Sequence, residues 1–485
     1  MKSELTKHDF DQHAGDQEQE EHAGEDEHAG GGYRPYAVIE IDDPLAPYAV
    51  AQTFVEMYCS HEGQRTLHYY RDEWHRWNQT HYQVVDDDDM RGLMYKFLSR
   101  CSQGTTLVSP DRAMVGNVAD ALKAVCNLSN TLEPPVWLGV DGEPATEIIA
   151  CKNGLLHLPT RVLQAHTPAL FNHNAVEFEY NALAPRPERW IQFLQELWLG
   201  DQESQETLEE ILGYCLTGDT HFQKMFLLVG PRRGGKGTIA RALTGLSGER
   251  NVISPPLLQL TQEMGLEPLI GKRVAIVPDA RIGPGANHSA LTERLLAISG
   301  EDSLSFNRKY KRYWNGRLPV RIVIFSNELP AIRDASGTLV SRFIVLRMVH
   351  SWYGREDLFL YERLKNELPG IFNRAVDGWR RLNACGRFLQ PRSAQGLLDE
   401  FEDLMAPIKA FAEECLVEGR HLYCLREAAY NLYREWCGDN GFAVQNIANF
   451  GRSLHALYPH LETRRPRDGS GPRGRTYEGI GLRAR

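Results

Sequence analysis

The sequence predicts an α/β protein of two to four domains, organised around one glycine-rich loop. Three observations support this fold class: a length of 485 residues, a hydrophobic content of 42%, and a strand-type run that the loop joins to a helix-type pattern. A chain of this length exceeds one typical domain. Its apolar content is enough to build several sizeable cores.

The loop lies between an apolar run at residues 225–229 and a helical apolar pattern at residues 239–246. Glycines let backbone N–H groups turn inward around phosphates, and the N-terminus of the following helix favours negative charge. This context predicts a nucleoside triphosphate site in which Lys236 reaches the β- and γ-phosphates. The expected binding residues are Gly230, Pro231, Arg232, Arg233, Gly234, Gly235, Lys236, Gly237 and Thr238.

The residue after Lys236 is Gly237, where a phosphate loop of this pattern has Ser or Thr. Thr238, one position later, is therefore the hydroxyl available to Mg²⁺. The same Gly-Lys-Gly-Thr order is found in nucleotide-kinase loops, so a small-molecule or nucleotide kinase stays open as an alternative. A glycine-rich turn with a surface lysine is the simplest structural alternative.

Two later apolar runs end in polar residues that suit nucleotide chemistry. Residues 273–277 lead to Asp279, and residues 322–326 lead to Asn327. An acid at a strand tip beside the loop can order Mg²⁺ and the attacking water, and Asn327 can sense the γ-phosphate or position water. The structural alternatives are a helix cap or turn for Asp279 and a turn for Asn327.

Arg342 begins another strand-type run, residues 343–346. An arginine in this place is a candidate finger that completes the nucleotide site of a neighbouring subunit. This role requires a head-to-tail ring, because a heterologous contact closes only by rotation.

Residues 307–317 form a basic segment in which five of eleven residues are cationic, none is acidic and three are aromatic. Asn315-Gly316 predicts a hairpin turn. The composition favours an element that tracks a nucleic-acid backbone and stacks bases, although a solvated loop is the alternative. The expected DNA contacts are Arg308, Lys309, Tyr310, Lys311 and Arg312.

The charge is distributed unevenly. Ten acids and two lysines among the first 30 residues contribute −8 to the net charge of −10, so the rest of the chain is near −2. Residues 1–35 therefore predict a disordered acidic tail. Nine cysteines without a Cys-x-x-Cys pair predict a reducing cytoplasm, and no apolar run approaches the roughly 18 residues of a membrane helix.

Three further domains are expected. Residues 36–186 predict a mixed α/β domain with aromatic strands near 67–70, 74–77 and 81–82, a helix over 88–100 and a hairpin turn at Asn153-Gly154. Residues 187–391 predict the nucleotide domain, in which two amphipathic helices at 190–198 and 208–216 lead into the loop. Residues 392–485 predict helices at 397–416, 425–436 and 447–457 and then an Arg-rich hairpin, the pattern of a winged helix.

The motifs together resemble the superfamily III helicase domain of phage and plasmid primase–helicase proteins, which are related to poxvirus primase–helicases. The resemblance covers roughly residues 60–480 and rests on the order of the motifs. These are the loop at 230–238, the acid-ended strand at 273–279, the basic segment at 300–317, the Ser326-Asn327-Glu328-Leu329-Pro330 motif and the position of Arg342.

This resemblance implies an AAA+-type P-loop core with ATP and Mg²⁺ as cofactors, and catalytic roles for Lys236, Asp279, Asn327 and Arg342. It also implies a homo-oligomeric ring, expected to be a hexamer, that moves on single-stranded DNA. The winged helix is expected to hold duplex DNA, and other replication proteins are expected partners. An initiator that binds ATP and DNA without unwinding is the alternative from a different class.

Overall fold

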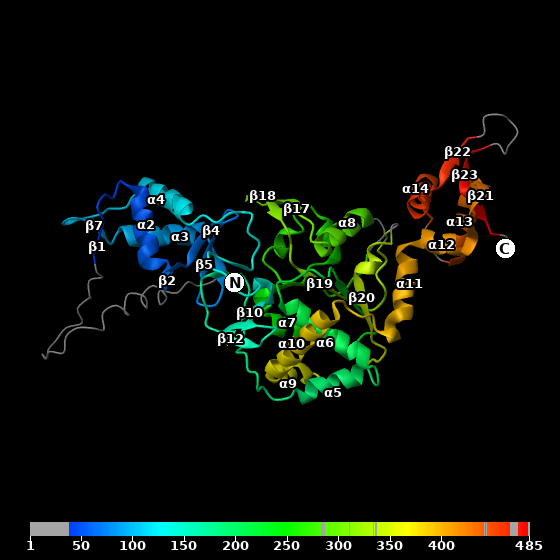
Figure 1. The fold of residues 1–485 in the computed structure, drawn as a ribbon, viewed down its shortest axis with the longest axis horizontal. Coiled ribbons are helices and arrows are strands. Elements are labelled where there is room, and N and C mark those ends of the chain that lie inside the picture. The colour runs from blue at the N-terminus through cyan, green and yellow to red at the C-terminus, as the bar shows by residue number, and fades with distance from the viewer. Residues whose placement is uncertain are drawn as a thin grey trace. The chain divides into compact units, whose positions relative to one another are not determined.

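The computed structural model divides into two compact units, and Figure 1 labels their helices and strands. The first unit contains the chain up to Leu132 together with residues 137–140 and 167–172, and the second contains the rest. The boundary expected at residue 186 therefore falls inside the second unit. The acidic tail and Tyr310 lie outside the described residues, which are 38–282, 287–309, 311–332, 334, 337–440, 442, 444–465 and 474–483.

Helices and a small antiparallel sheet form the first unit. Its helices are α2 (Pro47–Tyr58), α3 (Asp87–Leu98) and α4 (Arg112–Val125), and its main sheet is β4 (Leu67–Tyr70), β5 (Glu73–Trp77) and β6 (Tyr82–Val85). Three acids in the first turn of α3 suit the positive end of a helix. The Trp74 indole is buried and donates from Nε1 to Asp87 Oδ1 at 2.9 Å, which joins the sheet to α3. The strands and the helix expected here are confirmed.

Short elements complete this part of the chain. Residues Cys151 and Gly154 pair across a tight turn, so the hairpin expected at Asn153-Gly154 is confirmed. Its strands are β10 (Ile148–Cys151) and β11 (Gly154–His157), which β12 (Val162–Gln164) extends. The other short strands are β1 (Ile39–Glu40), β2 (Ser60–His61), β3 (Gln64–Arg65), β7 (Cys101–Gln103), β8 (Thr106–Leu107), β9 (Val136–Trp137) and β13 (Leu170–Phe171).

A five-stranded parallel sheet is the centre of the second unit. Its order is β15 (Val252–Ile253), β16 (Val274–Val277), β19 (Arg321–Ser326), β14 (Met225–Val229) and β20 (Phe343–Arg347). The three central strands are buried along their whole length, because apolar side chains fill both faces of the sheet. Parallel strands covered on both faces require such continuous apolar runs, which is why the sequence predicted them.

Separate cores cover the two faces of this sheet. One face packs under α5 (Glu188–Leu197), α6 (Gln202–Leu216), α7 (Lys236–Ser247), α9 (Leu360–Asn366) and α10 (Leu368–Cys385). The other face packs under α8 (His288–Ser299), the hairpin of β17 (Leu304–Arg308) and β18 (Lys311–Gly316), and α11 (Gln395–Met405). The two amphipathic helices expected before the loop are α5 and α6.

Helices α6 and α10 approach each other through glycines. A Cβ atom at Gly213 would lie 2.1 Å from the Ala375 carbonyl oxygen, and one at Gly378 would lie 2.4 Å from the Glu209 carbonyl carbon. Each glycine thus lets one backbone touch the other. Beside this contact the buried Glu209 carboxylate accepts from Arg374 Nε at 2.6 Å and from Arg381 Nη2 at 3.1 Å.

The C-terminal part contains three helices and a three-stranded sheet, namely α12 (Pro407–Cys415), β21 (Leu416–Leu425), α13 (Arg426–Asn440), α14 (Ile447–Leu457), β22 (Glu462–Arg464) and β23 (Thr476–Leu482). Helix α14 has the predicted bounds. The single helix predicted over 397–416 is wrong, because α11 ends at Met405 and Pro407 begins a new helix after Ala406. The prediction also missed β21. Among the described residues, no helix is both long and apolar enough to span a bilayer.

Candidate nucleotide site

The loop from Gly230 to Gly235 connects β14 to α7, as the sequence predicted. A Cβ atom at Gly230 would lie 2.6 Å from Met348 Cβ, and one at Gly235 would lie 2.8 Å from Leu197 Cδ2. Gly235 also has a φ of 92°, which side chains disfavour. The glycines therefore let the loop lie directly against the end of β20 and against α5. Gly237 has no atom within 4 Å of its would-be Cβ, so packing does not explain a glycine there.

The Lys236 side chain folds back over the loop. Its Nζ atom donates to Gly230 O at 2.5 Å, to Pro231 O at 2.7 Å and to Asn327 Oδ1 at 3.0 Å. Partial burial lowers the pKa of this amine. All three partners are neutral oxygens, and the two loop carbonyls hold the cation without cancelling its charge. The lysine therefore remains suited to an anion at the mouth of the loop.

Strand order explains why Asn327 reaches Lys236 and Asp279 does not. Asn327 follows β19, which is hydrogen-bonded to β14. Asp279 follows β16, one strand further away, which corresponds to a lateral distance of about 10 Å from β14. The Asp279 carboxylate is half-exposed and lies 3.4 Å from Arg281 Nε. All three residues belong to the same edge of the sheet, where the carboxyl ends of the strands meet.

Thr238, the expected Mg²⁺ ligand, occupies the third position of α7 and is buried. Gly237 beside it is exposed. The threonine thus belongs to the inner side of the helix, and its role as a metal ligand stays a prediction.

Arg342 lies at the opposite edge of the sheet. The parallel register pairs Met225 with Phe343, so Arg342 stands beside the start of β14 and hydrogen-bonds to Gln223. Five residues of strand separate this edge from Gly230, which is about 16 Å at ~3.3 Å per residue. The structure therefore brings Lys236 and Asn327 together and leaves Arg342 far from the loop of its own chain.

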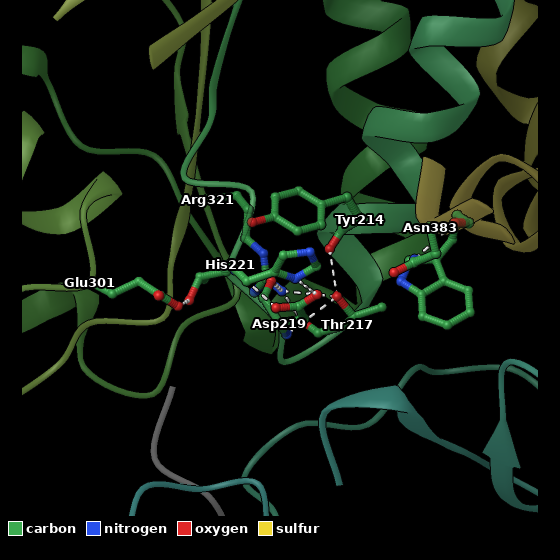
Figure 2. A network of polar contacts seen from close by, with 9 residues as sticks. Tyr214, Thr217, Asp219, His221, Glu301, Arg321 and Asn383 are labelled. Atoms are coloured by element: carbon green, nitrogen blue, oxygen red, sulfur yellow. Dashed lines mark hydrogen bonds and ion pairs between the residues drawn. The ribbon is translucent and has the colours of Figure 1, made fainter. Parts of the chain in front are cut away.

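Two buried arginines, Arg321 at the start of β19 and Arg273 just before β16, belong to this opposite edge, and Figure 2 shows Arg321 beside Tyr214. Arg321 is 1% exposed and donates from Nη2 to Asp219 O at 2.5 Å, and its guanidinium lies 5.1 Å from the centre of the Tyr214 ring. Arg273 donates from Nη1 to Thr217 O at 3.1 Å. Burial lowers the pKa of both guanidinium groups, and Arg321 lowers that of Arg273 further. Backbone carbonyls are fixed partners, so these two cations hold the loop at 217–219 in place.

Sequence reasoning missed the residues behind the loop. Ser351 Oγ donates to Arg232 O at 2.8 Å, and the Trp352 backbone N–H donates to Arg233 O at 3.1 Å. These bonds tie the loop to the segment that follows β20. Arg347 is exposed at the end of β20 and pairs in register with Val229, so it stands next to the loop. The sequence signal that could have identified Arg347 is a cationic residue at the end of a strand that pairs with β14.

The basic segment forms the β17–β18 hairpin, but its turn lies between Arg308 and Lys311. The turn predicted at Asn315-Gly316 is wrong, because both residues pair inside β18. Trp314 is 3% exposed and stacks on Phe306 with ring centres 4.9 Å apart, so this aromatic pair packs in the core. The stacked pair fixes the register and overrides the local turn signal.

The expected DNA contacts of this hairpin differ in exposure. Arg308 is 5% exposed and donates from Nε to Arg312 O at 3.3 Å, so burial removes it from the accessible surface. Lys309, Lys311 and Arg312 are exposed near the turn, as is Tyr313. The accessible cations therefore cluster at the tip of the hairpin, and DNA binding by this tip stays a prediction.

Comparison with known proteins gives three family matches. Residues 51–199 match "D5 N terminal like", residues 228–342 match "Family of unknown function (DUF5906)", and residues 408–484 match "RFX DNA-binding domain". The first match relates that part of the chain to the N-terminal region of primase–helicase proteins, as the resemblance in sequence implied. The second begins in β14 and ends at Arg342, so its range contains all four residues that we expected to be catalytic.

Among solved structures, the chain is similar to the C-terminal region of NrS-1. Two structures of that region give TM-scores of 0.47 and 0.46 at 12% sequence identity, and each comparison covers 91% of this chain and 100% of the other chain.

Proposed function

We propose that this chain is an ATP-dependent DNA helicase with an AAA+-type P-loop core of superfamily III type, acting as a homo-oligomeric ring in the replication of a phage, plasmid or other mobile element. The observation that carries the proposal is the contact of Lys236 with Asn327 at the mouth of the loop. The D5-type family match supports the replication context.

The residues present suit ATP with Mg²⁺. Side chains at Gly230 and Gly235 would fill the space that the loop backbone occupies, and the helix N-terminus adds partial positive charge. Bound ATP with Mg²⁺ would supply the phosphoryl group whose hydrolysis drives movement. Lys236 then holds the outer phosphates, and Asn327 fixes the lysine and orients water beside the γ-phosphate.

Asp279 is the residue that we expect to orient the metal and the attacking water, because it follows the next strand at the same edge. Asp279→Asn keeps the side chain's shape and removes the charge. We expect nucleotide affinity to change by less than about threefold and the hydrolysis rate to fall about 10²-fold, the size of effect that one well-placed polar group contributes. A matched exchange at the exposed Asp302 is the control. An equal loss in both variants would contradict this role.

Arg342 suits a role in trans. It cannot reach the loop about 16 Å away in its own chain, and it is partly exposed at the opposite edge. In a head-to-tail ring this edge faces the loop of the next subunit, which is the contact that an arginine finger needs.

The DNA side of the proposal rests on two surfaces. The hairpin tip presents Lys309, Lys311 and Arg312, which suit the phosphates of a single strand. The C-terminal order of α12, β21, α13, α14, β22 and β23 supports a winged helix, and the RFX-type match supports contact with duplex DNA.

An initiator that binds ATP without unwinding DNA is the second candidate. The ion pair of Asp279 with Arg281 favours it, because an engaged carboxylate is less able to bind a metal. DNA-stimulated ATP hydrolysis, measured beside strand displacement on a forked duplex, separates the candidates. A helicase shows both activities, and Lys236→Ala loses both. Stable ATP binding without displacement would favour the initiator, and phosphate transfer to a small acceptor would favour a kinase.

A further inference from the structure

A surface hollow that could hold a ligand lies beside the phosphate loop. A hollow of about 410 Å³ is lined by Gln192, Gln195, Glu196, Leu199, His350, Ser351, Trp352 and Arg355. It lies between the exposed side of α5 and the segment that follows β20. We propose that this hollow receives the adenine base of the bound nucleotide, an inference that rests on the proposed function.

The position of the hollow supports this assignment. Ser351 and Trp352 on one wall hydrogen-bond to the carbonyls of Arg232 and Arg233 in the loop. On the other wall, α5 touches the loop through Leu197, close to the would-be Cβ of Gly235. Both walls thus contact the segment just before Lys236. A nucleotide whose phosphates lie in the loop has its base within reach of such a neighbouring hollow.

Aromatic rings in the hollow suit a flat base. Trp352 is half-buried, and its ring centre lies 6.3 Å from that of His350, with the two planes tilted by 59°. An indole that is packed on one side against the core keeps a fixed face toward the hollow. Such a face stacks on any base, which provides affinity before hydrogen bonds select among bases.

The polar groups in the hollow suit adenine. Glu196 is occupied by Arg189, whose two terminal nitrogens lie 3.2 and 3.3 Å from its carboxylate oxygens. Gln192 and Gln195 are exposed on α5 and line the hollow. A glutamine amide offers one donor and one acceptor face, the complement of the amino group and ring nitrogens of adenine. Arg355 offers donors only, which suit the ring nitrogens of adenine as well as the acceptors of guanine, so the glutamines carry the selection.

The test compares nucleotides with inorganic tripolyphosphate, which has no base, by calorimetry on the full chain. Trp352→Ala is expected to raise the Kd for ATP about tenfold or more and to change the Kd for tripolyphosphate less than about twofold, because only the stacking is lost. Trp352→Phe keeps a ring and should retain most of the ATP affinity. Tyr353→Ala, an exposed neighbour, is the matched control for the aromatic exchange.

The glutamines are tested by selectivity. Gln192→Ala and Gln195→Ala, made together, should remove a preference for ATP over UTP, while an exchange of the exposed Gln262 should preserve it. Unchanged ATP affinity in Trp352→Ala, equal losses of ATP and tripolyphosphate affinity, or a wild-type preference for GTP would each overturn the assignment. Wild-type protein that binds neither ATP nor tripolyphosphate would overturn the proposed function itself.

Discussion

Both edges of the parallel sheet carry basic side chains, but the two edges hold them differently. Lys236 lies at the carboxyl edge, is partly exposed and has neutral oxygens as partners. Arg321 at the amino edge is fully enclosed and bonded to the backbone of the segment at 217–219. The difference teaches that a cation at a strand end indicates function only where it stays accessible. A buried cation with carbonyl partners indicates a structural role.

The strongest way to break this comparison is to remove the accessible lysine. Lys236→Ala should abolish ATP turnover, because the outer phosphates lose their cation, and should leave the unfolding midpoint nearly unchanged. Steady-state hydrolysis and denaturant unfolding measure the two effects. Lys365→Ala, which removes an exposed lysine from α9, is the control. Normal hydrolysis by Lys236→Ala would show that the loop does not bind a triphosphate.

Arg342 sharpens the comparison because it belongs to the amino edge and yet remains partly exposed. Arg342→Ala should still bind ATP but hydrolyse it about 10³-fold more slowly. If the arginine acts in trans, mixing this variant with Lys236→Ala should restore part of the activity at shared interfaces. Full wild-type activity at dilutions where the protein is monomeric would contradict a role between subunits.

Arg321 tests the buried side of the comparison. Arg321→Met keeps the volume and removes the hydrogen bonds to the 217–219 segment, so the free energy of unfolding should fall by about 2 kcal/mol or more. Denaturant unfolding measures this loss, and Arg317→Met at an exposed position should cost little. If Arg321→Met keeps its stability and loses hydrolysis instead, the assignment of a structural role is wrong.

The smallest effect is expected for the β17–β18 hairpin, which contains both accessible cations and a buried one. Removing the charges of Lys309, Lys311 and Arg312 should weaken binding to single-stranded DNA. The slope of the logarithm of the binding constant against the logarithm of salt concentration should become shallower by about 2. Basal ATPase activity should survive, whereas stimulation by DNA should not. Arg308→Gln should leave the salt slope unchanged because this side chain is buried. An unchanged slope in the triple variant would make the tip an ordinary solvated loop.

Sequence patterns predicted the parts of the fold whose signals are local. The strand–loop–helix unit, α5, α6 and α14 follow from runs of buried side chains and helical periodicity. Strand β21 was missed because it begins directly after α12, and Glu418, Gly419 and Arg420 interrupt the apolar pattern. Its place depends on pairing with β23, which is distant in sequence.

The candidate site was predictable to the same extent. Lys236 and Asn327 could be named because Lys236 begins the helix after the glycine-rich loop and Asn327 directly follows a strand. Their direct contact, the burial of Arg308 and the wall behind the loop could not, because these features depend on residues far apart in the chain. Ser351, for example, supports a loop residue 119 positions before it. Side-chain type alone also does not distinguish an enclosed guanidinium from an exposed one.

The glycines at the contact between α6 and α10, Gly213 and Gly378, set the distance between these two helices. Even the single methyl group of alanine at Gly213 or Gly378 would overlap the opposing backbone. A related chain with any larger residue at either position must therefore space these helices further apart and shift what they cover. Reading these two positions across relatives would reveal which of them preserve the same helix geometry before any of their structures is known.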